Sequence, residues 1–275
     1  MPILHAIVLG LTQGLSEFLP ISSSGHLLLV PWAFGWHDFA GNADLEKTFD
    51  VALHLGTLIG AVAYFWNDII RYVRAGFSRS GDLETQRDRR FAWLLVLSCI
   101  PGAITGGLFE TPIEDHLGQI WLIGTMLIVF GAILYWADRQ RGTRELEAFS
   151  VRDAVLMGAG QALALQPGVS RSGVTISVGR KLDFDRDSAA RISFLMGIPI
   201  IAGAVVLKLG KQIARGFPHG FAAPFVWGII ASGVSGYIAV WGLLKLVRTR
   251  SFTPFVVYRF LAGIAVLVVF TTGIR

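Results

Sequence analysis

Long apolar runs recur along the 275-residue chain, with polar residues gathered in short segments between them. The longest runs cover 93–107, 120–136, 225–244 and 255–272. Each approaches the roughly 20 residues that a helix needs to cross a bilayer. The whole pattern predicts six transmembrane helices, near 49–66, 91–109, 119–137, 189–208, 225–247 and 254–273. We therefore interpret the chain as an all-α polytopic membrane protein.

Two further apolar stretches are each interrupted by a proline and then by a polar segment rich in serine and glycine. Pro20 precedes the first of these segments and Pro167 precedes the second. Proline removes a backbone donor and glycine frees the backbone, so helices break at such places. At membrane depth, broken backbone persists only where protein or a water-filled cavity surrounds it. The pattern therefore predicts two re-entrant helical hairpins, over 1–36 and 151–182.

The two hairpins are related by an internal repeat with a constant offset of 148 residues. Seven of the twenty positions in 6–25 are identical in 154–173, without a gap. Three predicted crossings separate the hairpins, and an odd number places them on opposite faces of the membrane. We therefore expect a single membrane domain, 1–275, built from inverted repeats at approximately 1–137 and 151–273.

Composition and charge agree with this layout. The chain is 53% hydrophobic and 16% charged, whereas soluble domains are about 25% charged. Seventeen of its 24 basic residues fall in four short segments, 71–90, 138–152, 180–191 and 245–250. The positive-inside rule places these segments in the cytoplasm and both termini outside, so the net charge of +5 does not indicate nucleic-acid binding. The single cysteine excludes a disulfide framework.

The first break places ionisable and hydroxyl side chains at membrane depth. A charge there costs about 2.5–3.5 kcal/mol and marks a functional site by default. Glu17 shares a helical face with Gln13, four residues earlier, and is followed by three consecutive serines and His26. Serines can satisfy the broken backbone, but that purpose needs no ionisable group. Glu17 and His26 are therefore candidate site residues.

The second break places Arg171 among hydroxyls and glycines, at the expected start of a helix. Helix N-termini bind anions, and the planar guanidinium fork suits phosphate oxygens. The alternative is that Arg171 simply pairs with Glu17, and the two roles can coexist. If the two breaks face each other, they form an asymmetric site for a phosphorylated group.

Two weaker features concern predicted spans. Arg259, inside the last span, is either a second phosphate ligand or a cation stacked on aromatic rings. Asp50 and His54 are four residues apart at the start of another span, which fits a helix-surface pair as well as a role at the mouth of the site.

The two breaks resemble the undecaprenyl-diphosphate phosphatase family, the bacitracin-resistance membrane proteins of bacteria. That family carries a (Glu or Gln)-x-x-x-Glu motif and a serine-rich segment ending in Gly-His, matched here by Gln13-x-x-x-Glu17 and by 22–26. It also carries Pro-Gly-x-Ser-Arg-Ser-x-x-Thr, matched without departure by 167–175. The resemblance covers the whole chain in length and span order. Some relatives have Glu where this chain has Gln13, so a metal-binding or base role at that position stays open.

The resemblance implies a membrane phosphatase that converts undecaprenyl diphosphate into undecaprenyl phosphate and inorganic phosphate. This reaction would recycle the lipid carrier for peptidoglycan synthesis and give bacitracin resistance. A divalent cation, Mg²⁺ or Ca²⁺, would be held by Glu17. The site would face the outer side of the bacterial plasma membrane. The implied partners are the polyprenyl diphosphate and membrane lipids, with no nucleic acid and with a homodimer left open.

The resemblance also suggests a role for each matched residue. Ser23 would be the nucleophile, His26 its general base, and Arg171 the phosphate clamp. The remaining expected substrate contacts are Gln13, Ser22, Ser24, Ser170, Ser172, Thr175 and Arg259. Attack by His26, or by water with Glu17 as its base, stays open. The alternative function is a transporter or flippase of a phosphorylated lipid, because secondary transporters also use broken helices that meet at mid-membrane.

Overall fold

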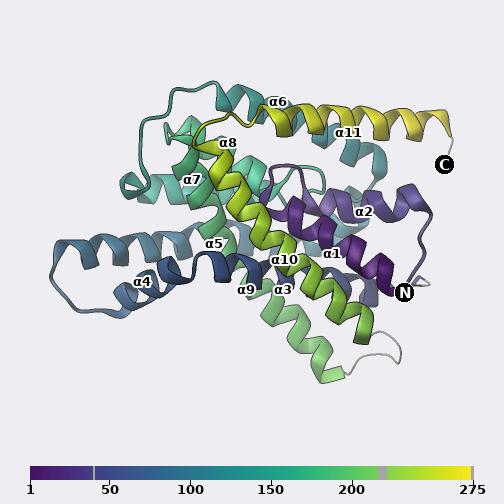
Figure 1. Ribbon diagram of the computed structural model, residues 1–275, viewed down its shortest axis with the longest axis horizontal. Coiled ribbons are helices and arrows are strands. Elements are labelled where there is room, and N and C mark those ends of the chain that lie inside the picture. Colours follow the sequence, from purple (N-terminus) through teal and green to yellow (C-terminus); the bar gives the residue numbers. More distant parts are fainter. Residues whose placement is uncertain (40, 216–221, 274–275) are drawn as a thin grey trace.

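The structure is a computed structural model that describes residues 1–39, 41–215 and 222–273, without the side chains of 110–116 and 209–215. These residues form eleven α-helices and one short 3₁₀ turn (Figure 1). The helices are α1 (Ile3–Phe18), α2 (Ser23–Phe34), α3 (Ala43–Tyr64), α4 (Trp66–Phe77), α5 (Leu83–Leu117), α6 (Ile120–Asp138), α7 (Val151–Leu163), α8 (Arg171–Lys181), α9 (Arg186–Arg215), α10 (Ala222–Val247) and α11 (Thr253–Thr272), with the turn η1 (Leu146–Ala148) before α7.

Five helices in the described ranges are long and apolar enough to cross a membrane. They are α5 over Leu83–Phe109, α6, α9 over Arg186–Lys208, α10 and α11. Helices α3 and α4 pass the same test as a pair that bends by 83°, which supplies a sixth candidate. The prediction of an all-α polytopic membrane protein is confirmed, and each of the six predicted spans falls on one of these helices.

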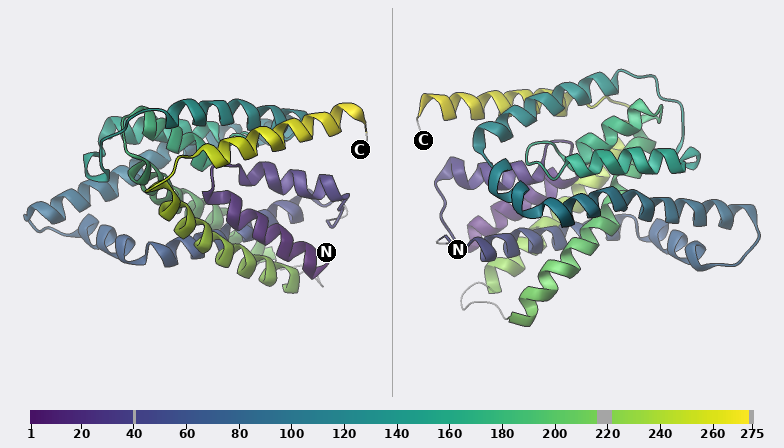
Figure 2. Two further views of the ribbon diagram at one scale, coloured as in Figure 1. Left: turned by 45° about the horizontal axis from the view of Figure 1, so that its top comes forward. Right: turned by 180° about the vertical axis from the view of Figure 1, so that it is seen from behind.

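The segment 71–90, a basic segment that lies between two predicted spans, is mostly helical. Helix α4 continues to Phe77, and α5 begins at Leu83, eight residues before the predicted span. Asp82 caps α5 by accepting the N–H of Thr85 at 2.8 Å. The two helices extend together from one end of the molecule, opposite the end where both termini lie (Figures 1 and 2). Hydropathy marks the part of a helix that suits the bilayer, and it does not register a charged extension of the same helix.

Both predicted hairpins consist of two short helices joined by a non-helical break. Ser22 ends the first break and Ser170 ends the second, each as the N-cap of the next helix, with φ of 81° and 74°. Each serine side chain accepts a backbone N–H three residues later, from Gly25 and Gly173 respectively. Positions related by the offset of 148 therefore share an uncommon backbone conformation. The boundaries of the two repeats and their inverted placement stay predictions.

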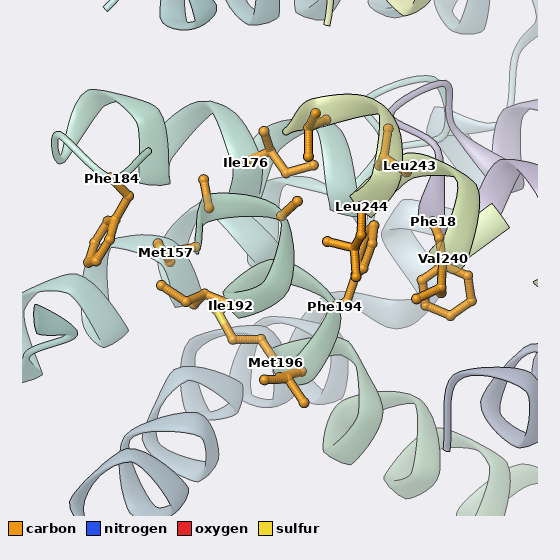
Figure 3. Packing of buried hydrophobic residues seen from close by; sticks show 14 of the residues in the cluster. Phe18, Met157, Ile176, Phe184, Ile192, Phe194, Met196, Val240, Leu243 and Leu244 are labelled. Atoms are coloured by element: carbon orange, nitrogen blue, oxygen red, sulfur yellow. The ribbon is translucent and has the colours of Figure 1, made fainter. Parts of the chain in front are cut away.

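An apolar core holds the two hairpins against α9 and α10 (Figure 3). Phe18 at the end of α1 meets Phe194 of α9 edge to face, with ring centroids 5.3 Å apart. Met157 of α7, Ile176 of α8 and Leu243 of α10 belong to the same buried cluster. Within a bilayer, tight packing of this kind holds helices together. The core therefore fixes the two breaks relative to one another.

Candidate active site

Glu17, in the last turn of α1, is the centre of a buried polar cluster. Its side chain is 5% exposed. Its Oε2 accepts hydrogen bonds from Gln13 Nε2 at 3.0 Å and from Ser23 Oγ at 2.6 Å. Its Oε1 accepts from Arg171 Nη2 at 3.1 Å and Nε at 3.3 Å. The structure thus brings together four of the predicted site residues: two lie before the first break, one lies after it, and Arg171 follows the second break.

Arg171 is the first residue of α8. Its side chain lies between α8 and α9, and its guanidinium pairs with Glu17 of α1. Its Nη1 donates to the Ser193 carbonyl at 3.2 Å. The space for the guanidinium exists because residue 197 is glycine. A Cβ at Gly197 would overlap the guanidinium itself. A small residue on α9 therefore determines where the cation lies.

Ser23 holds the equivalent place in the first repeat, as the first residue of α2. The offset of 148 relates Ser23 to Arg171, so the two helix starts carry a hydroxyl and a cation at corresponding positions. The first N–H groups of a helix have no partner within it and attract anions. A half-buried hydroxyl, a carboxylate that accepts its proton, a guanidinium and two helix N-termini form a suitable site for a phosphate group.

The predicted contact between Ser23 and His26 is not formed. His26 Nδ1 lies 2.7 Å from the Ser22 carbonyl, which can only accept, so Nδ1 carries the proton. His26 Nε2 then accepts from the Tyr258 hydroxyl at 2.6 Å. A spacing of three allows two side chains to share a helix face, but Tyr258, which is distant in sequence, takes the free ring nitrogen. The Ser23 hydroxyl donates to Glu17 instead.

The other predicted hydroxyl contacts serve the backbone of the two breaks. Ser22 Oγ accepts the Gly168 N–H at 3.0 Å, and Ser172 Oγ donates to the Leu19 carbonyl at 3.1 Å, so each break binds the other. Thr175 Oγ1 bonds to Ser193 Oγ at 2.6 Å. Ser170 Oγ, which caps α8 by accepting the Gly173 N–H, also lies 3.3 Å from Ser172 Oγ. The half-buried side chain of Ser24 makes no hydrogen bond within the described part of the chain.

Arg259 lies outside this cluster. Its guanidinium donates to five backbone carbonyls of α6 and the two breaks. No described aromatic ring stacks on it. The structure therefore does not place Arg259 with Glu17 and Arg171, and its predicted contact with substrate stays a prediction.

The chain matches the family described as bacitracin resistance protein BacA over residues 6–265. It belongs to the BacA family. It is 47% identical to an undecaprenyl-diphosphatase of Pelotomaculum thermopropionicum over 269 residues, 98% of this chain and 97% of that protein. It is 45% identical to proteins of the same name from Moorella thermoacetica, with 98% of each chain covered, and from Geobacter sulfurreducens, with 97% and 98% covered. The resemblance deduced from the two motifs is confirmed.

His54 also lies beside Glu17, whereas its spacing from Asp50 in the sequence fitted a helix-surface pair as well as a role at the mouth of the site. His54 Nδ1 lies 2.8 Å from the Asp50 carbonyl, so this nitrogen carries a proton. The other nitrogen, Nε2, faces Glu17 Oε2 at 3.6 Å. The spacing of Asp50 and His54 indicated a shared helix face, but only the packing of α3 against α1 shows that this face meets Glu17.

Gln13 adds a second unusual feature to the cluster around Glu17. The side chain is fully buried, and its Oε1 has no hydrogen-bond partner within the described part of the chain. A buried polar atom without a partner costs roughly 1–3 kcal/mol. Gln13 Oε1 is thus an acceptor without a donor beside the Glu17 carboxylate, which His54 Nε2 also faces.

Proposed function

We propose that this chain hydrolyses undecaprenyl diphosphate to undecaprenyl phosphate and inorganic phosphate. The observation that carries the proposal is the Ser23 hydroxyl at 2.6 Å from Glu17, whose other carboxylate oxygen binds Arg171. The relatives' shared name, undecaprenyl-diphosphatase, supplies the substrate. This activity recycles the lipid carrier for peptidoglycan synthesis and underlies the bacitracin resistance of the family name.

The reaction divides into two displacements at phosphorus. Ser23 Oγ attacks the terminal phosphorus while its proton passes to Glu17, to which it already donates a hydrogen bond. A serine–phosphate bond forms, and the anhydride P–O bond breaks. Undecaprenyl phosphate leaves as an anion and needs no proton. After Glu17 has released its proton to solvent, it accepts one from the water that attacks the phosphoserine. Glu17 passes this proton to Ser23 Oγ as the serine–phosphate bond breaks, which releases inorganic phosphate and restores both residues. The geometry favours Glu17 over His26 as the base.

Arg171 stabilises the charge that moves during both displacements. Its guanidinium pairs with Glu17 before substrate binds, and a phosphate group placed between the helix starts offers it further oxygen acceptors. The N-termini of α2 and α8 supply backbone N–H groups to the same phosphate. Fixed donors of this kind stabilise developing charge without reorganisation during the reaction.

The residues present also fit a divalent cation. Gln13 Oε1 lacks a partner within the described residues, the Glu17 carboxylate is an anionic oxygen donor, and His54 Nε2, once deprotonated, would offer a lone pair beside it. A Mg²⁺ or Ca²⁺ ion held by Glu17 and Gln13 would neutralise part of the diphosphate charge. His54 would complete the ligand set, and imidazole also suits transition metals.

Replacing His54 by alanine should weaken binding of Mn²⁺, used as a spectroscopic substitute for Mg²⁺, by about tenfold. The free Mn²⁺ signal in electron paramagnetic resonance measures this affinity directly, without turnover. His37→Ala is the matched control, because it removes an exposed imidazole from the segment between α2 and α3. This variant should bind Mn²⁺ normally. Equal Mn²⁺ affinity in the His54→Ala and wild-type proteins would remove His54 from the ligand set.

The substrate lipid and the basic segments suggest the cellular placement. We place the protein in the bacterial plasma membrane, with the segments 71–90, 138–152, 180–191 and 245–250 in the cytoplasm. The first hairpin, which contributes Glu17 and Ser23, then enters from the outer face, so the active site opens outward. The polyprenyl diphosphate and membrane lipids are the proposed partners, and a homodimer stays a prediction.

Purified protein should release inorganic phosphate from undecaprenyl diphosphate in the presence of Mg²⁺. Arg171→Lys should release far less, because lysine keeps the charge but loses the planar fork. Sealed right-side-out vesicles should release phosphate into the external medium if the site opens outward. A folded wild-type protein that binds the lipid but releases no phosphate would contradict the proposal and favour transport of the phosphorylated lipid.

A further inference from the structure

Arg259 of α11 is the largest fully buried side chain in the described part of the protein, at 0% exposure. Its Nη1 donates to the Pro20 carbonyl in the first break at 3.1 Å. Its Nη2 donates to the Gly168 and Val169 carbonyls in the second break at 2.8 and 3.1 Å. Its Nε and Nη2 also donate to two carbonyls of α6, at 3.1 and 3.3 Å. One guanidinium therefore contacts both breaks and α6.

Two of these carbonyls are equivalent in the internal repeat. The offset of 148 relates Pro20 to Gly168, and Arg259 binds one through Nη1 and the other through Nη2. Three residues later, the same offset relates Ser23 to Arg171. The planar guanidinium thus spans corresponding points of the two breaks, three residues before the two helix starts that meet at Glu17.

No carboxylate forms an ion pair with Arg259 among the described residues. A buried charge without a counter-ion is costly, and polar side chains at membrane depth mark functional sites. If the side chain at position 259 only filled space between helices, an apolar residue would do so without burying a charge. Direct phosphate binding would require the guanidinium to exchange carbonyl partners for substrate, since its three nitrogens all donate to carbonyls here.

We propose that Arg259 is a positioning residue that holds the two re-entrant breaks in register and thereby sets the geometry of Ser23, Glu17 and Arg171. The proposal rests on the phosphatase function proposed above. Among the described residues, the other hydrogen bonds between the two hairpins run from Gly168 to Ser22, from Ser172 to Leu19 and from Arg171 to Glu17. A lysine at position 259 would keep the charge, but it has three donors on one nitrogen and cannot span both breaks.

Arg259→Lys should lower kcat by about 100-fold or more while KM changes less than threefold, because misplacement by about 1 Å can cost 10²-fold in rate. Spin labels at Ala33 of α2 and Leu163 of α7, both exposed and placed in a Cys99→Ser background, report the distance between the hairpins. The electron–electron distance distribution should broaden in Arg259→Lys relative to the same labels with arginine.

Arg180→Lys is the matched control. Arg180 is also buried and also donates to backbone carbonyls, of Phe184 and Gln140, at a distance from the site residues. Its replacement should lower the melting temperature and leave both kcat and the label distance unchanged. If Arg259→Lys cannot be purified folded, Gly131→Ala tests the same side chain, since its Cβ would lie 3.3 Å from the Arg259 Cβ.

Two results for Arg259→Lys would contradict the positioning role, and each would assign Arg259 a different role. A lower melting temperature with unchanged kcat and distance distribution would make Arg259 structural only. A raised KM with an unchanged distance distribution would make it a phosphate ligand. The distance measurement needs no catalysis, so it tests positioning even if wild-type protein releases no phosphate and the proposed function fails.

Discussion

Replacement of Ser23 by alanine is expected to reduce phosphate release by about 10³-fold or more, without unfolding the protein. The hydroxyl is the candidate nucleophile, and the carboxylate that accepts its hydrogen bond is paired on the other oxygen with Arg171. Loss of one hydrogen bond costs roughly 0.5–1.5 kcal/mol, which a protein of this size tolerates. Phosphate release by the purified variant, with thermal melting as the test of folding, measures the effect.

The neighbouring serines supply the controls for this prediction. Ser24→Ala removes a hydroxyl without a described partner and should leave turnover almost unchanged. Ser22→Ala should melt at a lower temperature, because Ser22 Oγ accepts two backbone N–H groups, but it should keep measurable activity. A general base should be nearly as essential as the nucleophile, but the bond of His26 to Tyr258 predicts a smaller loss for His26→Ala than for Ser23→Ala.

Substantial activity in folded Ser23→Ala would refute the serine mechanism. Glu17 would then activate water directly, or His26 would attack phosphorus itself. Trapping separates the two, because His26 would carry a phosphoryl group in an acid-labile N–P bond, whereas direct attack by water leaves no phosphorylated protein. With Ser23 as nucleophile, the rapidly quenched wild-type protein should instead carry an acid-stable phosphoserine.

Gly197→Ala should lower kcat/KM by about 100-fold with little change in the melting temperature. The added Cβ would overlap the Arg171 guanidinium, which is the flexible end of a long side chain and can move aside at low cost. Once moved, the cation no longer lies at the oxygen of Glu17 that faces it now. A displacement of about 1 Å in a catalytic group is enough for such a loss.

Gly203→Ala is the matched control for this variant, since Gly203 lies on the same helix and no atom approaches its added Cβ within 4 Å. It should raise the melting temperature slightly, because alanine in a helix is favoured over glycine by about 1 kcal/mol. Normal turnover by Gly197→Ala, with phosphate affinity also unchanged, would mean that the observed position of Arg171 is unimportant for the reaction.

The membrane helices and the local part of the site could be predicted from the sequence. Apolar runs report burial in lipid, and both hairpins follow from proline, glycine and serine at fixed offsets. The Gln13–Glu17 bond follows from a spacing of four on a helix. The motifs also identified Ser23 and Arg171 before any geometry was known.

The contacts that were missed join residues distant in the chain. His26 binds Tyr258, His54 faces Glu17, and Arg259 bonds to both breaks, so each pairing depends on how helices pack. Glu17 and His26, both within six residues of Ser23, could each bind its hydroxyl. The backbone path of the break is what brings Ser23 to Glu17. Spacing indicates which side chains can share a face, whereas the course of a non-helical break is a property of the folded chain.

The corresponding positions of Ser23 and Arg171 also restrict how such a site can arise. A symmetric pair of identical short chains would carry the same residue at both helix starts. Two serines would lack the cation, and two arginines would lack the candidate nucleophile. Once both copies are joined in one polypeptide, each can mutate independently, and the pair can become unlike. Duplication and fusion therefore allow the two helix starts to carry different residues. The equivalent Pro20 and Gly168 carbonyls of the two copies still bind one and the same residue, Arg259.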